Sequence, residues 1–511
     1  LAWHPNRLSR NSLDGGRIIH LVDTGKIKEL KFPTFVFDPS PSGRRKSAID
    51  VSREASTCSE RSTLCFKNIM FDEHHVFCDT SIMELAFTNR TAELKELESA
   101  ATAGGLLVVF GRRRVGKTRL LTHWMGPRQG LYSQAIEGAK EIQLEQVFRD
   151  IQDRLTTSLV PKSWGELLEL LAMRKGQSMF CLDEFPYLVA SDPSLPSILQ
   201  RWLDHYRPKN FLLILAGSST RMMNNLFLNR SAPLYGRARK LLHIEPMSYG
   251  AFCAARRLNP ADQESFTRFA MVGGVPKYWE FVEAKASAID LADELFFGFA
   301  PYLDQEPSRV LRDEGISGVN AISVLEAIGR GAEKSSEMAA RLGTVQTNLS
   351  RLLQQLLDAS VLTREIPFGE SPRSTKKTRY SIHDPALRFW FRVYSPHRTR
   401  WHRYGHVEKA KLLHDHASTV FEDFCRQQHA GASRYWEGDL EFDFVRADHR
   451  GPGRDTAVVT EVKWKQLAAR ERAEIEKRLA ADWQRCALRG RFKEVAFEVL
   501  DATVLKDIQR Q

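Results

Sequence analysis

Three short runs of apolar residues in the first half of the chain each lead into glycine or polar residues. The runs occupy positions 106–110, 179–182 and 211–216, and segments with helical patterns separate them. Continuous apolar runs of this length are typical of strands that a parallel sheet buries on both faces. Strands that alternate with helices predict a doubly wound α/β fold, in which ligands bind at the carboxyl ends of the strands.

The first run continues directly into GRRRVGKT, residues 111–118, which has the spacing GxxxxGK[ST]. Gly111 and Gly116 allow the backbone to curl so that its N–H groups point at phosphates, and the following helix adds its positive end. Lys117 can reach the β- and γ-phosphates, and the Thr118 hydroxyl can bind Mg²⁺. The sequence therefore predicts a site for a nucleoside triphosphate with Mg²⁺. The expected cofactor-binding residues of this loop are Gly111, Arg112, Arg113, Arg114, Val115, Gly116, Lys117 and Thr118.

The ends of the other two runs supply polar groups that nucleotide hydrolysis needs. Asp183 follows the second run, and we expect it to hold Mg²⁺ together with Thr118. Glu184 comes next and is placed to orient or deprotonate the attacking water. Ser218 and Ser219 follow the third run, and either could contact that water or the γ-phosphate. All of these side chains are expected at the same edge of the sheet.

Several sequence elements together resemble the prokaryotic, archaeal-type AAA+/STAND ATPases. They are FTNR at 87–90, the GRRRVGKT loop, LDEFPYL at 182–188, GSS at 217–219, PLYGR at 233–237 and GGVP at 273–276. The resemblance implies an ATP-binding, AAA+-like P-loop core with a helical lid over residues 83–310. It also implies an arginine that reaches the γ-phosphate in cis or from a neighbouring subunit of a homo-oligomer. Arg237 matches this residue, and a plain surface arginine is the alternative.

Residues 320–382 have the pattern of three helices followed by a hairpin. Helices are expected at 321–328, 336–342 and 344–358, and paired strands at 361–366 and 378–382. This order predicts a winged-helix domain, with a basic segment beside it, over residues 311–411. In DNA-binding proteins the second helix of such a motif enters the major groove, whereas other proteins use the module to dock a protein partner. The side chains that could face outward on that helix are Gln346, Asn348, Arg351 and Gln354.

The last hundred residues, 412–511, resemble the PD-(D/E)xK nuclease superfamily, which has a restriction-endonuclease-like α/β fold. Asp443 lies on one expected strand, and Glu461-Val-Lys463 lies on the next. The resemblance implies that Asp443 and Glu461 bind Mg²⁺, and that Lys463 positions water or stabilises developing charge. Glu422 matches an acidic residue on the preceding helix of that superfamily. The proline that usually precedes the first acid is replaced by Phe442, and carboxylates that only satisfy local charges are the alternative interpretation.

Composition and charge narrow the classes of partner. The chain has 511 residues and a formal net charge of +11, which permits an anionic partner. Residues 361–411 hold 12 basic against 4 acidic residues, so DNA binding is expected at this strip. The apolar runs are too short to cross a bilayer, and seven scattered cysteines favour a reducing cytoplasm.

Two functions are consistent with these patterns. The first is an ATPase that couples ATP hydrolysis to DNA binding, with metal-dependent DNA cleavage by the C-terminal domain. The alternative is a signalling or scaffold NTPase whose winged helix and tail bind proteins without cleavage. Residues 1–82 lack a sustained helical or strand period. We expect them to be a disordered extension, or not part of the native protein if Met83 is its start.

Overall fold

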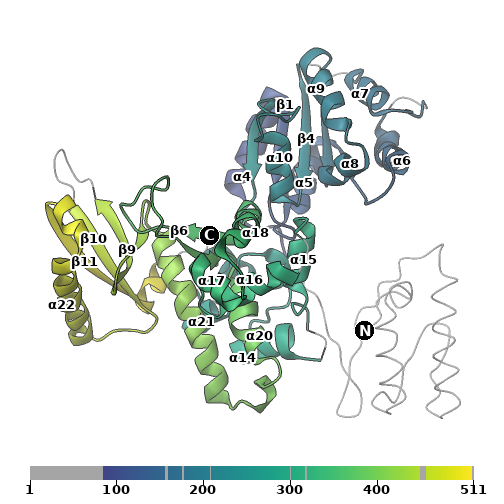
Figure 1. Ribbon diagram of the computed structural model, residues 1–511. Helices are drawn as coiled ribbons and strands as arrows, with labels where there is room; N and C mark the ends of the chain where they lie inside the picture. Colours follow the sequence, from purple (N-terminus) through teal and green to yellow (C-terminus); the bar gives the residue numbers. More distant parts are fainter. Residues whose placement is uncertain are drawn as a thin grey trace, which may run out of the picture. The chain divides into compact units, whose positions relative to one another are not determined.

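The computed structural model describes residues 85–155, 159–174, 178–207, 209–299, 301–316, 319–448 and 456–508 (Figure 1). The expectation for residues 1–82 lies outside these ranges. In the described part of the chain, no helix is long and apolar enough to span a membrane.

A five-stranded parallel sheet forms the first part of the structure, as expected. Its strands are β1 (Gly105–Phe110), β2 (Leu131–Gln134), β3 (Ser178–Asp183), β4 (Phe211–Gly217) and β5 (Ala238–His243), in the order β2-β3-β4-β1-β5. All neighbouring strands pair in parallel. Because β4 lies between β1 and β3, the carboxyl ends of the three strands meet at one edge.

Helices cover both faces of this sheet because successive strand residues point to opposite sides. They are α4 (Thr91–Ala103), α5 (Lys117–Met125), α6 (Lys140–Ile151), α7 (Trp164–Ala172), α8 (Phe185–Ser191), α9 (Leu195–His205) and α10 (Thr220–Phe227), with short turns η1 (Gly126–Arg128) and η2 (Gln152–Arg154). Leu106 and Val108 share a buried cluster with α6 to α10. Leu107 and Val109 share another with α4 and α5. This two-faced burial explains the continuous apolar runs.

A helical region follows, and its core extends far along the sequence. It contains α11 (Tyr249–Arg256), α12 (Gln263–Val272), α13 (Pro276–Trp279), α14 (Ala288–Ala292), η3 (Asp293–Phe297) and α15 (Glu306–Asp313). The Phe266 ring on α12 lies 5.4 Å from the Phe421 ring and 5.0 Å from the Trp464 ring, measured between centroids. The lid region and the C-terminal region therefore share one buried cluster.

The expected three helices and hairpin are present. They are α16 (Val319–Gly329), α17 (Ser335–Arg341), α18 (Gln346–Asp358), β6 (Leu362–Glu365) and β7 (Arg379–Ile382), and β6 and β7 pair antiparallel. Gln346, Asn348, Arg351 and Gln354 are exposed on α18, while Leu349 and Leu353 are buried.

Short helices then lead into a long one: α19 (Pro385–Phe389), η4 (Trp390–Tyr394), α20 (Ser395–His397), η5 (Trp401–Arg403) and α21 (His406–Gln427). The predicted domain boundary between residues 411 and 412 falls inside α21, which runs across it without a break. Its apolar face is buried in the cluster shared with the lid region. By its contacts, the chain from Leu85 onward is one compact unit.

The C-terminal elements form a four-stranded mixed sheet with the order β11-β10-β9-β8. Its strands are β8 (Ser433–Glu437), β9 (Leu440–Asp448), β10 (Thr456–Lys463) and β11 (Glu494–Asp501). The helix α22 (Ala469–Arg485) and the turn η6 (Ala487–Arg491) connect β10 to β11, and η7 (Ala502–Asp507) follows. β9 pairs antiparallel with β8 and β10, and β10 pairs in parallel with β11.

Candidate functional site

The loop between β1 and α5 has the tight backbone that its glycines permit. Gly111 has φ +153°, and a Cβ there would lie 2.3 Å from the Ile244 carbonyl oxygen, so a larger residue would not fit. Gly116 has φ +96°. Lys117 Nζ donates to the carbonyl oxygens of Gly111 at 2.8 Å and Arg112 at 3.1 Å. The ammonium group therefore lies inside the curve of the loop, where burial lowers the pKa of Lys117.

The hydroxyl of Thr118 and the carboxylate of Asp183 meet at the edge of the sheet. Thr118 Oγ1 donates to Asp183 Oδ2 at 2.6 Å. Tyr132 Oη on β2 donates to the same oxygen at 2.9 Å, and Asp183 is fully buried. Two oxygen donors side by side suit Mg²⁺. The sequence did not indicate Tyr132, although the place of β2 beside β3 brings it there.

Glu184 and Ser218 also meet at this edge. Glu184 has a left-handed backbone (φ +54°), and its carboxylate accepts hydrogen bonds from the Ser218 hydroxyl and, at 3.2 Å, from the Ser218 N–H. Ser219 behaves differently, since its hydroxyl caps α10 and donates to Glu314 Oε2 at 2.9 Å. Of the two serines, Ser218 is the one that contacts the candidate base.

The three loop arginines direct their side chains at protein carboxylates. The shortest N–O distances are 2.6 Å for Arg112–Asp384, 2.8 Å for Arg113–Asp313 and 2.7 Å for Arg114–Glu306. These partners, which lie on or after α15, could not be predicted from the sequence. Because the guanidinium groups pair with protein carboxylates, we expect these residues to contact a nucleotide through their backbone N–H groups.

Arg237 lies at the opposite edge of the sheet from the phosphate loop. β1 and β5 are parallel, and Phe110 pairs with His243, whereas Arg237 precedes β5. Its guanidinium group pairs with Asp204 at 2.8 Å and donates to the Pro233 carbonyl oxygen at 2.8 Å. The expectation that Arg237 reaches the γ-phosphate in cis is wrong, and its contribution to a neighbouring subunit stays a prediction.

The expected C-terminal carboxylates come together across two strands. Asp443 on β9 accepts a hydrogen bond from the Val462 N–H of β10 at 2.6 Å. Glu461 pairs with Lys463 at 2.8 Å and also with Arg478. Asp443, Glu461 and Arg478 line a cavity of about 250 Å³.

Asp443 also lines a second cavity of about 530 Å³, together with Glu422 of α21. Burial and the charge of Glu461 raise the pKa of Asp443 to about 6. Burial and the charge of Asp443 raise the pKa of Glu422 to about 8. No group of three or more His, Cys, Asp or Glu side chains suited to a metal occurs within the described ranges.

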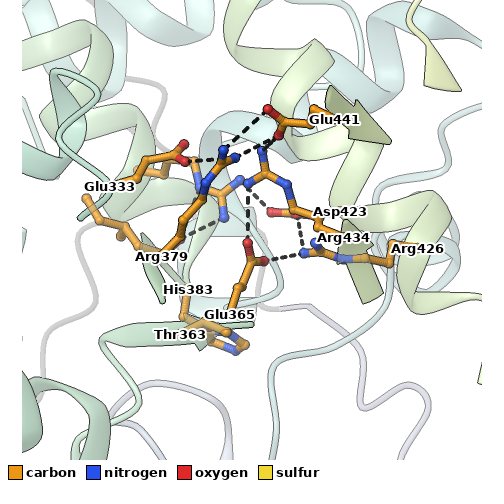
Figure 2. A network of polar contacts seen from close by, with 11 residues as sticks. Glu333, Thr363, Glu365, Arg379, His383, Asp423, Arg426, Arg434 and Glu441 are labelled. Carbon is orange, nitrogen blue, oxygen red and sulfur yellow. Dashed lines mark hydrogen bonds and ion pairs between the residues drawn. The ribbon is translucent and has the colours of Figure 1, made fainter. Parts of the chain in front are cut away.

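A network of ion pairs joins the hairpin to the C-terminal sheet (Figure 2). Arg379 of β7 pairs with Glu441 of β9 at 2.7 Å. Glu365 of β6 pairs with Arg426 of α21 at 2.7 Å and with Arg434 of β8 at 3.2 Å. Beyond the hairpin strand, the Phe368 N–H donates to the Arg434 carbonyl oxygen at 2.8 Å. This contact could not be predicted from the sequence, because charged residues in a hairpin are usually solvated.

Comparisons with known proteins identify the first part of the chain. Residues 87–281 match the family described as an ATPase domain predominantly from Archaea. The uncharacterized protein MJECL04 of Methanocaldococcus jannaschii is 26% identical over 405 residues, which cover 75% of this chain and 89% of the relative.

Two solved structures are similar at low identity. The Walker-type ATPase paby2304 of Pyrococcus abyssi has 18% identity and a TM-score of 0.45, and the match covers 60% of this chain and 96% of that one. The ORC1 protein of Aeropyrum pernix in complex with DNA has 15% identity and a TM-score of 0.28, with coverage of 63% and 96%. The family match carries the assignment: residues 87–281 are an archaeal-type ATPase domain, and the protein is an ATPase.

Proposed function

We propose that this ATPase couples hydrolysis of MgATP to DNA binding, and that its C-terminal sheet carries a metal-dependent nuclease site. The observation that carries the proposal is the meeting of Thr118, Asp183, Glu184 and Ser218 at one edge of the parallel sheet, beside Lys117. These groups supply a cation for phosphates, oxygen ligands for Mg²⁺ and a base for water.

Each of these side chains has one task in the proposed reaction. Lys117 binds the β- and γ-phosphates, and Thr118 and Asp183 hold Mg²⁺, which when bound neutralises charge on the phosphates. Glu184 accepts a proton from the attacking water, and Ser218 fixes the orientation of the Glu184 carboxylate. Arg237 is proposed to act on the nucleotide of a neighbouring subunit.

DNA binding is proposed for α18 and for the basic strip that follows it. The side chains of Gln346, Asn348, Arg351 and Gln354 are exposed on α18 and are polar or basic, as suits a helix that reads a groove, whereas the exposed Asp358 at its end is acidic. Within the strip, Arg379 and Arg388 pair with carboxylates of the C-terminal region. The exposed basic residues of the strip, which suit phosphate contacts, are Arg364, Arg373, Lys376, Lys377, Arg398, Arg400, Arg403 and Lys411.

Metal-dependent cleavage is proposed for Asp443, Glu461 and Lys463. Asp443 and Glu461 come from adjacent strands and line one cavity, an arrangement that supports shared binding of a divalent cation. Lys463, two residues after Glu461, would position water or stabilise charge on the phosphate. Glu422 faces Asp443 from α21 across the larger cavity and would add a further carboxylate.

One observation favours the scaffold alternative, in which the tail binds a protein partner and cuts nothing. Glu461 is already paired with both Lys463 and Arg478. A carboxylate with two cationic partners has less need of a metal ion. This alternative predicts nucleotide-dependent assembly and DNA affinity that depends little on salt.

ATP hydrolysis measured with and without duplex DNA tests the coupling. We expect DNA to change the turnover of the wild-type protein, and Lys117→Ala to abolish turnover with and without DNA. DNA affinity should fall steeply between about 50 and 200 mM salt, as phosphate contacts require. ATP turnover that DNA does not change, together with a DNA affinity that does not depend on salt, would favour the scaffold alternative.

Nicking of supercoiled plasmid with Mg²⁺ or Mn²⁺ tests the nuclease site separately. Asp443→Asn should abolish nicking and leave ATP turnover intact. Asp448→Asn, at the other end of β9, is the matched control and should nick like the wild type. Nicking that survives Asp443→Asn ends the nuclease proposal without touching the ATPase assignment.

A further inference from the structure

A chain of buried polar contacts joins the phosphate loop to two segments much later in the sequence. Arg112 and Arg114 belong to the loop. Tyr278 lies on α13, Glu306 begins α15, and Asp384 is the N-cap of α19. We call these five residues the loop clamp.

The contacts of the loop clamp are continuous. Arg114 Nη1 donates to Glu306 Oε2 at 2.7 Å, and the Tyr278 hydroxyl donates to Glu306 Oε1. Arg112 Nη2 donates to that same hydroxyl at 3.1 Å, and Arg112 Nη1 lies 2.6 Å from Asp384 Oδ2. The second oxygen of Asp384 accepts the Leu387 N–H at 2.9 Å, which ties the carboxylate to α19.

The tyrosine and the two carboxylates of the loop clamp are buried, and the formal charges of its five residues balance. Exposed fractions are 0% for Tyr278, 5% for Glu306 and 4% for Asp384. Two guanidinium groups face two carboxylates, so removal of one partner leaves an uncompensated buried charge. Burial alone lowers the pKa of Arg112, but the charge of Asp384 and its other neighbours more than offsets this effect. Arg112 therefore stays charged at this site.

The backbone of the loop needs such support. Arg114 has φ +72°, a left-handed conformation that is unfavourable for a residue with a Cβ. Glu306 holds its guanidinium group, and the Tyr302 ring lies 5.4 Å beneath it. These contacts fix the middle of the loop, whose N–H groups are those that face phosphates.

We infer that Glu306 and Asp384 are positioning residues for ATP hydrolysis: by holding Arg114 and Arg112, they keep the phosphate loop in its nucleotide-binding shape. Neither carboxylate belongs to the loop, and both are proposed to act through the loop arginines that they hold. The inference rests on the ATPase activity alone, so it is independent of the DNA-binding and nuclease proposals.

The pair Arg113–Asp313 offers a matched control. It joins the same loop to the same helix α15 at 2.8 Å, but the Arg113 side chain is 54% exposed. Exposed pairs of this kind contribute little. If the carboxylates position the loop because they are buried, neutralising Glu306 or Asp384 should change the KM for ATP, and neutralising Asp313 should not.

Steady-state ATP hydrolysis by Glu306→Gln, Asp384→Asn and Asp313→Asn tests the inference. Gln and Asn keep the shape of the side chains and remove their charge. Loss of loop shape weakens binding of substrate and transition state alike, so KM for ATP should rise about tenfold or more while kcat changes less than about threefold. Asp313→Asn should keep KM within about twofold of the wild type. Melting curves check that each variant is folded at the assay temperature.

A double-mutant cycle compares the wild type with Arg112→Met, Asp384→Asn and the double variant Arg112→Met/Asp384→Asn. If the two residues act as a pair, the rise in KM of the double variant will be well below the product of the single rises. This double variant, which removes both charges, also replaces Asp384→Asn if the single variant does not fold. An unchanged KM in folded Glu306→Gln and Asp384→Asn, or an equal rise in Asp313→Asn, overturns the inference. If the rise in KM of the double variant equals the product of the two single rises, the inference is overturned for Asp384.

Discussion

Single side chains at the strand ends determine what the nucleotide site can do. Ser218 and Ser219 are adjacent and chemically identical, yet one contacts the carboxylate of Glu184 and the other caps a helix and contacts Glu314. The Ser218 hydroxyl therefore serves the candidate base, and the Ser219 hydroxyl stabilises the start of α10. We expect removal of the first to lower ATP turnover and removal of the second to lower stability.

We predict that Ser218→Ala lowers kcat for ATP by about three- to tenfold, because Glu184 loses its orienting partner. Ser219→Ala should keep kcat and lower the free energy of unfolding by about 1 kcal/mol, because α10 loses its N-cap. Phosphate release and urea unfolding measure the two effects. Equal loss of turnover in both variants would contradict the assignment.

His416 on α21 is a residue-scale determinant of stability. Its ring is fully buried, and Nε2 donates to the Ala270 carbonyl oxygen at 2.8 Å. Burial lowers the pKa of His416 to about 3, and the nearby charges of Arg392 and Arg388 act in the same direction. The unfolded chain, with an ordinary histidine pKa of about 6.5, therefore binds the proton more readily than the folded protein does.

We predict that the folded protein loses stability as pH falls below about 6.5, by about 2 kcal/mol at pH 5 from His416 alone. His416→Gln, which keeps a donor for Ala270 and does not titrate, should make the pH dependence between 5 and 7 shallower. Urea unfolding at several pH values measures this slope. If His416→Gln leaves the pH dependence of the free energy of unfolding unchanged, His416 is not the source of that dependence.

At the scale of elements, ion pairs join the hairpin of β6 and β7 to the C-terminal sheet. Arg379 pairs with Glu441 and lies 4.4 Å over the Trp436 ring, and Glu365 bridges Arg426 and Arg434 (Figure 2). The Glu365 carboxylate is more buried than that of an ordinary surface pair, at 11% exposure, whereas the Glu441 carboxylate is 41% exposed. The charged side chains at the base of the hairpin therefore bind other parts of the protein.

We predict that Glu441→Gln increases amide hydrogen exchange in both β7 and β8, because Arg379 and Arg434 lose their shared partner. Asp439→Asn is the control, since Asp439 pairs with Arg485 while 84% exposed. Exchange measured by mass spectrometry should rise at least about threefold in the first variant and stay unchanged in the second. Local exchange confined to β9 would contradict the coupling.

The sequence predicted the elements better than their partners. The helix expected at 344–358 is α18, which begins two residues later, and the sheet follows the apolar runs directly. Thr118 and Asp183 were predictable because a loop motif and a strand end place them at one edge. Arg114–Glu306 and Phe266–Trp464 were not, because an apolar face or a charge does not reveal what it packs against. For the same reason the sequence did not indicate that the helix α21 would cross the boundary predicted between residues 411 and 412.

At the scale of the whole molecule, the position of Arg237 means that it could contribute to catalysis only at the nucleotide site of another copy of the chain. It lies at the amino edge of the sheet, while Lys117 lies at the carboxyl edge. A guanidinium group that contributes to catalysis from there would have to enter the site of a second subunit. Subunit mixing tests this requirement.

We predict that Arg237→Ala and Glu184→Gln are each nearly inactive alone, and that mixing the two restores a measurable part of the wild-type turnover. In a mixed assembly, some sites combine an intact Glu184 with a neighbour's intact Arg237. Lys117→Ala/Arg237→Ala mixed with Glu184→Gln is the control and should restore nothing, because no site then has both Lys117 and Glu184. Turnover by Arg237→Ala equal to the wild type would remove this residue from the mechanism.

The loop clamp also bears on how the protein is made. Arg114 and Glu306 are 192 positions apart, so the ribosome completes the entire segment 87–281 before the clamp carboxylates exist. A nascent chain that ends before Glu306 has Lys117 but lacks the carboxylates that hold Arg112 and Arg114. If these carboxylates position the loop as inferred, we expect the nascent chain to reach its full affinity for ATP only after Asp384 has emerged.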